Sequence, residues 1–372
     1  MLGIAILCKT LLKGGAEKQA LILAKSLQEK NIDVCIVNWY QDKIDPENLR
    51  YIRQNEIRYF PLNGGLISKL FSLKRLLENE NSGYIVSYLT FANIVAGISK
   101  LMGSDLKTIG GIRNEKLPYY KFVIERFVHN HVNDVTVFNN YSGKEKFKKR
   151  GFNPDKIHVI QNAIELDNRQ AKENENHGNS GESGNSGNEI KIVTVGRFVN
   201  QKDYPTALKS FRLLKDKCST TKLKYIIIGY GPLESEIRSL ANELEITGEV
   251  QIMINPPNIP EILRSSDIFL STSLFEGVSN AIMEAMVAGL PIVATEVGDN
   301  KYLIRNSFNG YLVPCKNIGL VVQKLVYLCE SEEKRLTFGK NSRLILERDF
   351  SMSLLVENYI NLFKSLGGEE NK

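Results

Sequence analysis

Short apolar runs alternate with longer amphipathic stretches along most of the chain, and this alternation predicts strands separated by helices. In the first half the runs lie at 3–8, 33–38, 57–60, 84–88, 107–112, 134–138 and 157–161. In the second half they lie at 190–195, 223–228, 249–253, 267–271, 291–295 and 311–313. Strands that alternate with helices form βαβ units. The pattern therefore predicts an α/β protein with two doubly wound, mostly parallel sheets. We expect these sheets to face each other across a cleft, since their ligands bind beyond the carboxyl ends of the strands.

A polar tract separates the two halves. Residues 168–189 are rich in Gly, Ser, Asn and Glu and almost free of apolar side chains, so they cannot bury a core. We therefore expect an N-terminal Rossmann-like domain over 1–167, a flexible linker, and a second Rossmann-like domain over 190–347. The remaining segment, 348–372, contains a predicted helix near 351–366 with a long apolar face, which we expect to pack back on the first domain.

The composition excludes several classes of protein. Hydrophobic and charged contents of 42% and 24% are typical of a soluble globular protein, and no run of 18 apolar residues predicts a membrane span. The N-terminus lacks the apolar core and cleavage site of a signal peptide, and the five cysteines are scattered, which favours a cytoplasmic protein. A net charge of +6 suits anionic partners without indicating nucleic acid. Four histidines without metal-ligand spacing, and the absence of Asp-x-Asp, predict no metal site.

The most informative segment is IFLSTSLFEGVSNAIMEAMVAGLPIVAT, residues 268–295. It predicts a strand, a loop that carries Glu276 and Gly277, and a helix that begins near Ser279. Glu284 is the only charged residue of that helix, and a lone carboxylate on an apolar helix is destabilising unless it finds hydrogen-bond donors. A ribose diol offers two donors, and the N–H groups at the helix start suit a diphosphate. The alternative for Glu284 alone is an ordinary exposed glutamate.

This segment resembles the retaining glycosyltransferases of family 4 (group 1), which have the GT-B fold. The shared pattern is Glu-Gly after a strand, a second Glu eight residues later, and small-Gly-x-Pro-Val-x-Ala-Thr, here at 288–295. The resemblance implies that Glu284 binds the ribose hydroxyls and that Glu276 lies beside the transferred sugar. It also implies donor contacts from Gly277, Val278, Ser279 and Asn280.

A second block, IVTVGRFVNQKDYPTALKSF at 192–211, is similar to the Gly-Arg…Lys signature that opens the donor domain of this family. Arg197 follows the predicted strand and Lys202 precedes a predicted helix. Two cations at the mouth of a parallel sheet can neutralise the charge that grows on a departing diphosphate. The resemblance thus makes Arg197, Lys202 and Glu276 the catalytic residues of a metal-independent enzyme. Taken singly, either cation could be an ordinary surface residue.

A third block, KYIIIGYGPLESEI at 224–237, is similar to the turn of this family that runs from a strand through Gly-x-Gly-Pro into a helix. Gly231 would let the nucleotide approach the backbone closely. Gly229 is better explained as a structural part of the turn. A bare Gly-x-Gly does not indicate a nicotinamide site.

The N-terminal half carries weaker signals. Gly14 and Gly15 resemble the glycine loop that faces the donor phosphates, with a flexible turn as the alternative. Arg113 stands where many family members have histidine and is a candidate for binding a phosphate or an acceptor hydroxyl, with a surface loop arginine as the alternative. The stretches 66–77 and 144–150 combine cations with apolar residues, which suits an anionic membrane surface. Amphipathic helices that cover their own domain are the alternative.

The resemblance predicts transfer of a sugar from a nucleoside-diphosphate sugar, with a UDP-sugar favoured, to a hydroxyl of a glycan or lipid-linked glycan. The reaction would retain the anomeric configuration, serve surface polysaccharide or glycolipid biosynthesis, and need no cofactor beyond the donor. The enzyme would be cytoplasmic, with peripheral contact to the inner face of the plasma membrane. Two alternatives stay open: a nucleotide-sugar epimerase of GT-B architecture, and a non-catalytic glycosyltransferase partner subunit.

Overall fold

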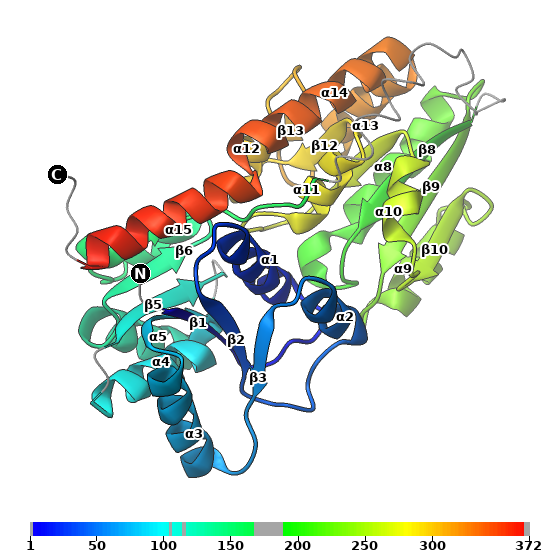
Figure 1. Ribbon diagram of the computed structural model, residues 1–372. Helices are drawn as coiled ribbons and strands as arrows, with labels where there is room; N and C mark the ends of the chain where they lie inside the picture. Colours follow the sequence, from blue (N-terminus) through cyan, green and yellow to red (C-terminus); the bar gives the residue numbers. More distant parts are fainter. Residues whose placement is uncertain (1–2, 104–105, 114–116, 167–188, 368–372) are drawn as a thin grey trace. The chain divides into compact units, whose positions relative to one another are not determined.

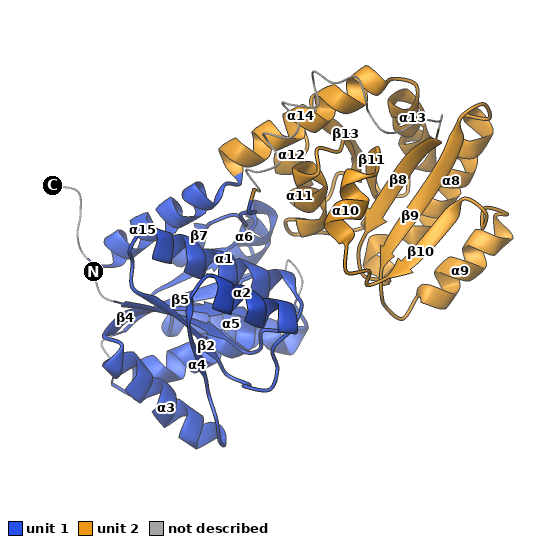
Figure 2. Ribbon diagram, turned by 45° about the vertical axis from the view of Figure 1, so that its right-hand side comes forward, with its two compact units in different colours: residues 1–165, 350–372 blue, residues 166–349 orange. Residues whose placement is uncertain are grey.

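The computed structural model describes residues 3–103, 106–113, 117–166 and 189–367 (Figure 1). These residues form two compact units. Unit 1 comprises residues 1–165 and 350–372, and unit 2 comprises residues 166–349 (Figure 2). The chain therefore passes between the units twice, once near 165 and once near 349. Apart from Glu189, the predicted linker at 168–189 lies outside the described residues.

Unit 1 contains a seven-stranded parallel sheet in the order β3-β2-β1-β4-β5-β6-β7. Its strands are β1 (Gly3–Cys8), β2 (Val34–Asn38), β3 (Arg58–Pro61), β4 (Ser82–Tyr88), β5 (Lys107–Ile112), β6 (Val135–Phe138) and β7 (Ile157–Val159). Its helices are α1 (Gly15–Glu29), α2 (Pro46–Gln54), α3 (Leu66–Asn79), α4 (Leu89–Leu101), α5 (Tyr119–His131), α6 (Tyr141–Lys148), the 3₁₀ turn η1 (Pro154–Lys156) and α15 (Met352–Gly367).

Helices cover both faces of this sheet, which explains why the central strand β1 is apolar at every position rather than at alternate ones. Along β1, Ile4 and Ile6 pack on the side of α1 and α15, whereas Ala5 and Leu7 pack on the side of α3 and α4. Helix α15 is part of this core, and the Tyr84 hydroxyl donates a hydrogen bond to the Phe363 carbonyl at 3.0 Å. The apolar face near 351–366 is thus buried in unit 1.

Unit 2 contains a six-stranded parallel sheet in the order β10-β9-β8-β11-β12-β13. Its strands are β8 (Glu189–Val195), β9 (Lys222–Gly229), β10 (Val250–Ile254), β11 (Ile268–Ser271), β12 (Ile292–Thr295) and β13 (Gly310–Val313). Its helices are η2 (Asn200–Lys202), α8 (Tyr204–Lys217), α9 (Glu234–Glu243), α10 (Ile259–Arg264), α11 (Asn280–Val287), α12 (Asn300–Leu303), α13 (Ile318–Cys329) and α14 (Glu332–Asp349).

The two parallel sheets confirm the predicted doubly wound α/β class. In each sheet the strand order reverses once, between β1 and β4 in unit 1 and between β8 and β11 in unit 2. Ligands of open parallel sheets bind beyond the carboxyl ends of the strands at such a reversal. Within the described residues, no helix combines the length and the apolar character needed to cross a bilayer.

Candidate functional site

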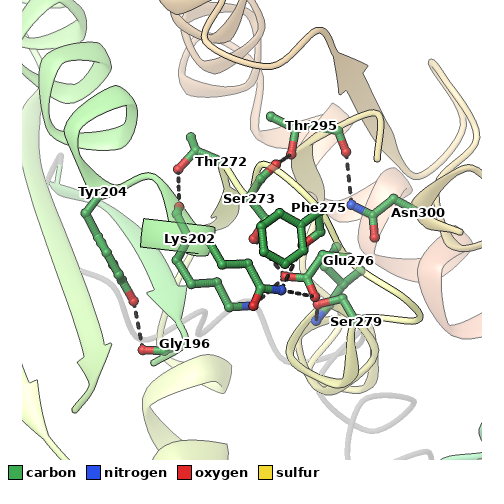
Figure 3. Close-up of polar contacts among 12 residues, drawn as sticks. Gly196, Lys202, Tyr204, Thr272, Ser273, Phe275, Glu276, Ser279, Thr295 and Asn300 are labelled. Carbon is green, nitrogen blue, oxygen red and sulfur yellow. Dashed lines mark hydrogen bonds and ion pairs between the residues drawn. The ribbon is translucent and has the colours of Figure 1, made fainter. Parts of the chain in front are cut away.

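A nearly buried ion pair lies at the carboxyl edge of the unit 2 sheet (Figure 3). The side chains of Lys202 and Glu276 are 15% and 9% exposed, and Lys202 Nζ is 2.5 Å from Glu276 Oε1. The Ser273 hydroxyl donates to the same oxygen at 2.8 Å, and the Gln201 side-chain amide donates to Oε2 at 3.4 Å. Both carboxylate oxygens therefore have donors, so the carboxylate is held in one orientation.

The segment after β8 is fixed to the end of β11, and this places Lys202. The Thr272 hydroxyl lies 3.0 and 2.9 Å from the carbonyl oxygens of Lys202 and Asp203. The Leu274 N–H donates to the Gln201 carbonyl at 2.8 Å. Asp203 itself has a φ of +48°, a left-handed conformation that aspartate tolerates better than most residues. These bonds turn the chain from η2 into α8 and direct Lys202 toward Glu276.

The loop that carries Glu276 is held from its other side by the segment after β12. Gly298 has a φ of +53°, and a Cβ at this position would lie 2.0 Å from the Glu276 carbonyl oxygen. The Asp299 N–H donates to the Gly277 carbonyl at 3.1 Å. Only glycine fits this approach without displacing the loop. The sequence interpretation assigned no role to Gly298 or Ser273, and their residue types alone do not indicate one.

Glu284 lies on α11, the helix that follows this loop. Ser279 is the N-cap of α11, and its hydroxyl accepts a hydrogen bond from the Ile282 N–H at 3.4 Å. The first helical turn, with its N–H groups, therefore begins at Asn280, one residue after the helix start that the sequence predicted near Ser279. Glu284 is only half-buried. The energetic cost of desolvating its carboxylate is therefore smaller than its position on an apolar helix predicted. Of the two carboxylates, it is that of Glu276 which is almost fully buried.

Arg197 and Gly231 follow β8 and β9 at the same edge of the sheet. Arg197 is exposed and forms no ion pair within the described part of the chain. Gly231 has a φ of +151°, and a Cβ there would lie 2.5 Å from the Phe198 carbonyl oxygen. The packing of Gly231 against the Phe198 backbone is thus a sufficient reason for a glycine at this position.

The glycine loop of unit 1 lies between β1 and α1. Gly14 is the N-cap of α1 with an ordinary extended φ of −171°, and Gly15 begins the helix. Neither residue has a positive φ, so the turn does not need the conformational freedom of glycine. Both residues are exposed. Burial raises the pKa of Glu17, which lies in the first turn of α1 beside Gly14.

Arg113 directly follows β5, and the structure contradicts the alternative of a surface loop arginine. Its Nη1 and Nη2 groups donate to Asn162 Oδ1 at 3.2 Å and to the Tyr359 hydroxyl at 3.3 Å. The guanidinium lies 4.5 Å from the centre of the Tyr88 ring. Its Nε is buried and has no hydrogen-bond partner among the described residues. No carboxylate pairs with Arg113 in this part of the chain, so its charge is available to an anion.

The two stretches predicted for membrane contact are helices with a mixed character. In α3, Leu73 and Leu77 are buried whereas Leu66, Ile67 and Phe71 are exposed. In α6, Phe147 is buried and the lysines at 146 and 148 are exposed. Each helix thus covers its own unit with one face and presents another to solvent. The described residues contain no cluster of three or more His, Cys, Asp or Glu side chains that could hold a metal ion.

Comparisons with known proteins match both units. Residues 13–168 match the family described as Glycosyltransferase Family 4, and residues 178–345 match Glycosyl transferases group 1. The chain is 23% identical over 307 residues, 80% of its length and 79% of the relative, to the UDP-Gal:alpha-D-GlcNAc-diphosphoundecaprenol alpha-1,3-galactosyltransferase of Escherichia coli.

A shorter match, 26% identical over 194 residues, joins 51% of the chain to 49% of a Campylobacter jejuni protein. That protein is the N-acetylgalactosamine-N,N'-diacetylbacillosaminyl-diphospho-undecaprenol 4-alpha-N-acetylgalactosaminyltransferase. Among solved structures, Anabaena Alr3699/HepE in complex with UDP-glucose superimposes with a TM-score of 0.79 at 15% identity. This superposition covers 98% of the chain and 100% of that structure, so the two proteins share a fold.

Proposed function

Because the chain belongs to the group 1 glycosyltransferases of the GT-B fold, we propose that it retains the anomeric configuration and uses a nucleoside-diphosphate sugar, with a UDP-sugar favoured. The observation that carries this proposal is the Lys202–Glu276 pair at the carboxyl edge of unit 2. The sheet reverses its strand order there, which is where such folds bind nucleotides. A fold match to a protein solved with UDP-glucose supports the choice of donor.

Arg197 and Lys202 are the groups that would bind the diphosphate. Two positive charges match the two negative charges of the diphosphate, and they would stabilise the charge that develops as the leaving group departs. Without a donor, Glu276 neutralises Lys202, so that neither charge is buried alone. When the donor binds, the diphosphate competes for the Lys202 ammonium and leaves Glu276 free to accept hydrogen bonds from sugar hydroxyls. These two protein cations fill the role of a divalent metal.

The remaining donor contacts follow from the positions of the loop and of α11. The backbone from Gly277 to Asn280 leads into the positive end of the α11 dipole, which favours a phosphate or a sugar hydroxyl oxygen. Val278 is part of the same loop. Glu284, one turn into the helix, would accept hydrogen bonds from the ribose diol. Gly231, and Gly15 from unit 1, would allow close approach of the nucleotide to the backbone.

The proposed chemical step forms one bond and breaks one bond at the anomeric carbon. The acceptor hydroxyl oxygen bonds to this carbon on the face from which the diphosphate departs. The bond from the carbon to the diphosphate oxygen breaks, and that oxygen takes the hydroxyl proton. The configuration is retained, and no separate protein base is required. Lys202 and Arg197 stabilise the diphosphate, and Glu276 orients the sugar.

For the acceptor we propose a glycan or lipid-linked glycan of surface polysaccharide or glycolipid biosynthesis. The two relatives named above act, by their names, on sugars attached to undecaprenol through a diphosphate. On this chain, Arg113 and Gly14 of the glycine loop are the candidates for contacting the acceptor or a phosphate. The absence of a carboxylate partner for Arg113 within the described residues supports this role.

We further propose that the protein is cytoplasmic and contacts the inner face of the plasma membrane through α5. This helix presents an apolar face to solvent, whereas an ordinary surface helix presents a polar one. The exposed apolar side chains of α5 are Tyr119, Tyr120, Val123, Ile124 and Phe127. The exposed cations Lys121 and Arg126 flank this face, and α6 adds further exposed lysines. Aromatic residues bordered by cations suit the headgroup region of an anionic bilayer.

Nucleotide release from a panel of sugar nucleotides, measured with and without cell lipid extract, tests the reaction. We expect release that requires the lipid fraction and that is lost in Glu284→Ala. Glu236→Ala, an exposed glutamate of α9, is the matched control and should leave release unchanged. Interconversion of free sugar nucleotides without an acceptor would indicate the epimerase instead. Donor binding without turnover would indicate the non-catalytic partner subunit.

A further inference from the structure

Three lysines that have no carboxylate partner among the described residues lie on a group of aromatic rings at the carboxyl edge of the unit 1 sheet. Two of the rings follow β2, the third lies in the first turn of α4, one lysine follows β1, and another belongs to α3. The members of this lysine–aromatic cluster are Lys9, Lys43, Lys69, Trp39, Tyr40 and Phe91.

Lys69 is the buried member of the cluster, with 8% of the residue exposed. Its Nζ donates to the Trp39 carbonyl at 2.7 Å and lies 5.6 and 4.7 Å from the ring centres of Trp39 and Tyr40. A carbonyl oxygen and the faces of aromatic rings attract a cation, but neither carries a full negative charge. No carboxylate approaches this ammonium in the described part of the chain, so its charge remains uncompensated.

Lys9 and Lys43 are exposed members of the same cluster. Lys9 Nζ lies 5.2 Å from the centre of the Phe91 ring, and Lys43 Nζ lies 5.0 Å from that of Tyr40. The Tyr40 and Phe91 rings are themselves stacked at 6.1 Å. Neither lysine forms an ion pair with a described residue, and their ring contacts are weak at exposed sites. An incoming anion can therefore recruit both ammonium groups without breaking a salt bridge.

The fold places this cluster where a ligand of unit 1 is expected. Lys9, Trp39 and Phe91 follow the carboxyl ends of β1, β2 and β4, which adjoin the reversal of strand order between β1 and β4. Arg113, at the end of β5, adds a fourth cation without a carboxylate partner in the described residues. The same sheet edge thus combines uncompensated positive charge with aromatic surface.

We propose that the lysine–aromatic cluster binds an anionic group of the acceptor, either a phosphate or a carboxylate. Lys9 and Lys43 donate charge-assisted hydrogen bonds to the anion, and Lys69 supplies a fixed positive charge below it. The rings of Tyr40 and Phe91, which are partly exposed, pack against the apolar part of the acceptor next to the anion. Naming the ligand as the acceptor rests on the proposed function, whereas the preference for an anion rests on the cluster alone.

The cluster contains a built-in reporter, because Trp39 is the only tryptophan of the chain. We would saturate the full-length protein with UDP, so that the donor site cannot take up a second diphosphate. Trp39 fluorescence would then be followed during titration with farnesyl diphosphate, with glucuronic acid, and with glucose as the uncharged control. We expect a saturable change with at least one of the two anions and none with glucose.

The double variant K9Q/K43Q should raise the apparent Kd for that anion by about tenfold or more, since two charge-assisted hydrogen bonds are lost. The matched control K30Q/K364Q removes the same charge from two other exposed lysines of unit 1 and should leave the Kd unchanged. Both pairs are exposed, so neither variant endangers the fold.

The outcomes separate the possible ligands and the two proposals. A response to farnesyl diphosphate assigns the site to the phosphate of a lipid-linked acceptor, and a response to glucuronic acid assigns it to an acidic sugar. No response to either anion, an equal response to glucose, or an unchanged Kd in K9Q/K43Q would overturn the proposal. UDP binding is measured separately by calorimetry, so its failure would contradict the donor site and not this cluster.

Discussion

Lys202 and Glu276 come from segments 74 residues apart and meet with side chains that are 15% and 9% exposed. Removing one member of such a pair leaves the other charge nearly buried and uncompensated, which costs about 3 kcal/mol or more. We therefore expect Lys202→Ala to lower the free energy of unfolding by about 3 kcal/mol. It should also weaken UDP binding. Chemical denaturation measures the first effect and calorimetry the second.

An exposed pair of the same unit is the matched control. Lys215 and Glu249 form an ion pair with side chains that are 39% and 30% exposed. Solvent screens this pair, so Lys215→Ala should change the free energy of unfolding by less than about 1 kcal/mol. If the two lysine variants lost equal stability, burial would not be what gives the Lys202–Glu276 pair its strength.

Single residues show where interpretation of the sequence stops. Motifs marked Lys202 and Glu276 separately, but not their contact, because that contact depends on the fold of both loops. Gly298 holds the Glu276 loop by a close backbone approach, and the sequence alone does not show which backbone it approaches. The sequence left Arg113 open between an anion-binding residue and a surface loop arginine, because the residues that enclose it, among them Asn162 and Tyr359, come from remote segments.

At the scale of elements, α5 contains a titratable group that links its packing to pH. His129 is buried, its Nδ1 and Nε2 lie 2.8 Å from the Thr136 hydroxyl and 3.0 Å from the Asn153 carbonyl, and burial lowers its pKa from 6.5 to about 4. The unfolded chain therefore takes up a proton at a higher pH than the folded one. Stability is full above pH 6.5 and falls as the pH drops toward 4, by up to about 3 kcal/mol.

Denaturation of His129→Gln across this range tests the assignment. The variant loses the titrating group, so the fall in stability between pH 6.5 and 4 should become shallower than in the parent protein. His131, two residues further along α5, is exposed. His131→Gln is the control and should keep the parent slope. If the free energy of unfolding of His129→Gln fell with pH as steeply as that of the parent protein, another group would be responsible for the pH dependence.

The outer face of α5 makes a separate prediction about membrane binding. We expect the protein to sediment with vesicles that contain phosphatidylglycerol and not with vesicles of phosphatidylcholine alone, since the flanking cations require an anionic surface. I124S/F127S should reduce this binding by about tenfold or more, because it removes apolar area that would be buried in the bilayer. L336S/L344S changes two exposed leucines of α14 in unit 2 and serves as the matched control.

Sedimentation of I124S/F127S equal to that of the parent would exclude α5 as the contact. A parent protein that forms dimers, and a variant that is monomeric in analytical ultracentrifugation, would show that a second copy covers this face instead.

Elements differ in how far the sequence predicts them. Strand β1 is covered on both faces and is an unbroken apolar run, and its bounds agree with the expected range. The bounds of β8, which also contains polar residues, agree with the expected range to within a residue. The orientation of α5 was not predictable in this way. Its buried side carries Phe122 and Val128, and its exposed side carries Ile124 and Phe127. Because apolar residues lie on both sides of α5, the hydrophobic pattern does not predict which side is buried. Only the packed structure shows which face of the helix is exposed to solvent.

At the scale of the whole molecule, the proposed reaction requires both units to act on one donor, because Gly15 belongs to unit 1 and Glu284 to unit 2. Hydrogen exchange with and without UDP-sugar tests this requirement directly. The backbone at 196–204 and 272–284 should gain protection if unit 2 binds the nucleotide as proposed. The loop at 10–17 should gain protection in the same experiment if the glycines of unit 1 approach the donor phosphates.

Glu284→Ala distinguishes direct contact from an indirect effect. If one ligand protects both segments, loss of its ribose contact should abolish protection at 10–17 and at 196–204 together. Protection confined to unit 2 in the parent protein would show that the donor is bound by this unit alone. The glycine loop would then have to serve the acceptor, beside Arg113 and the lysine–aromatic cluster at the same sheet edge. The exchange pattern therefore decides whether unit 1 shares in donor binding or contributes only the second substrate.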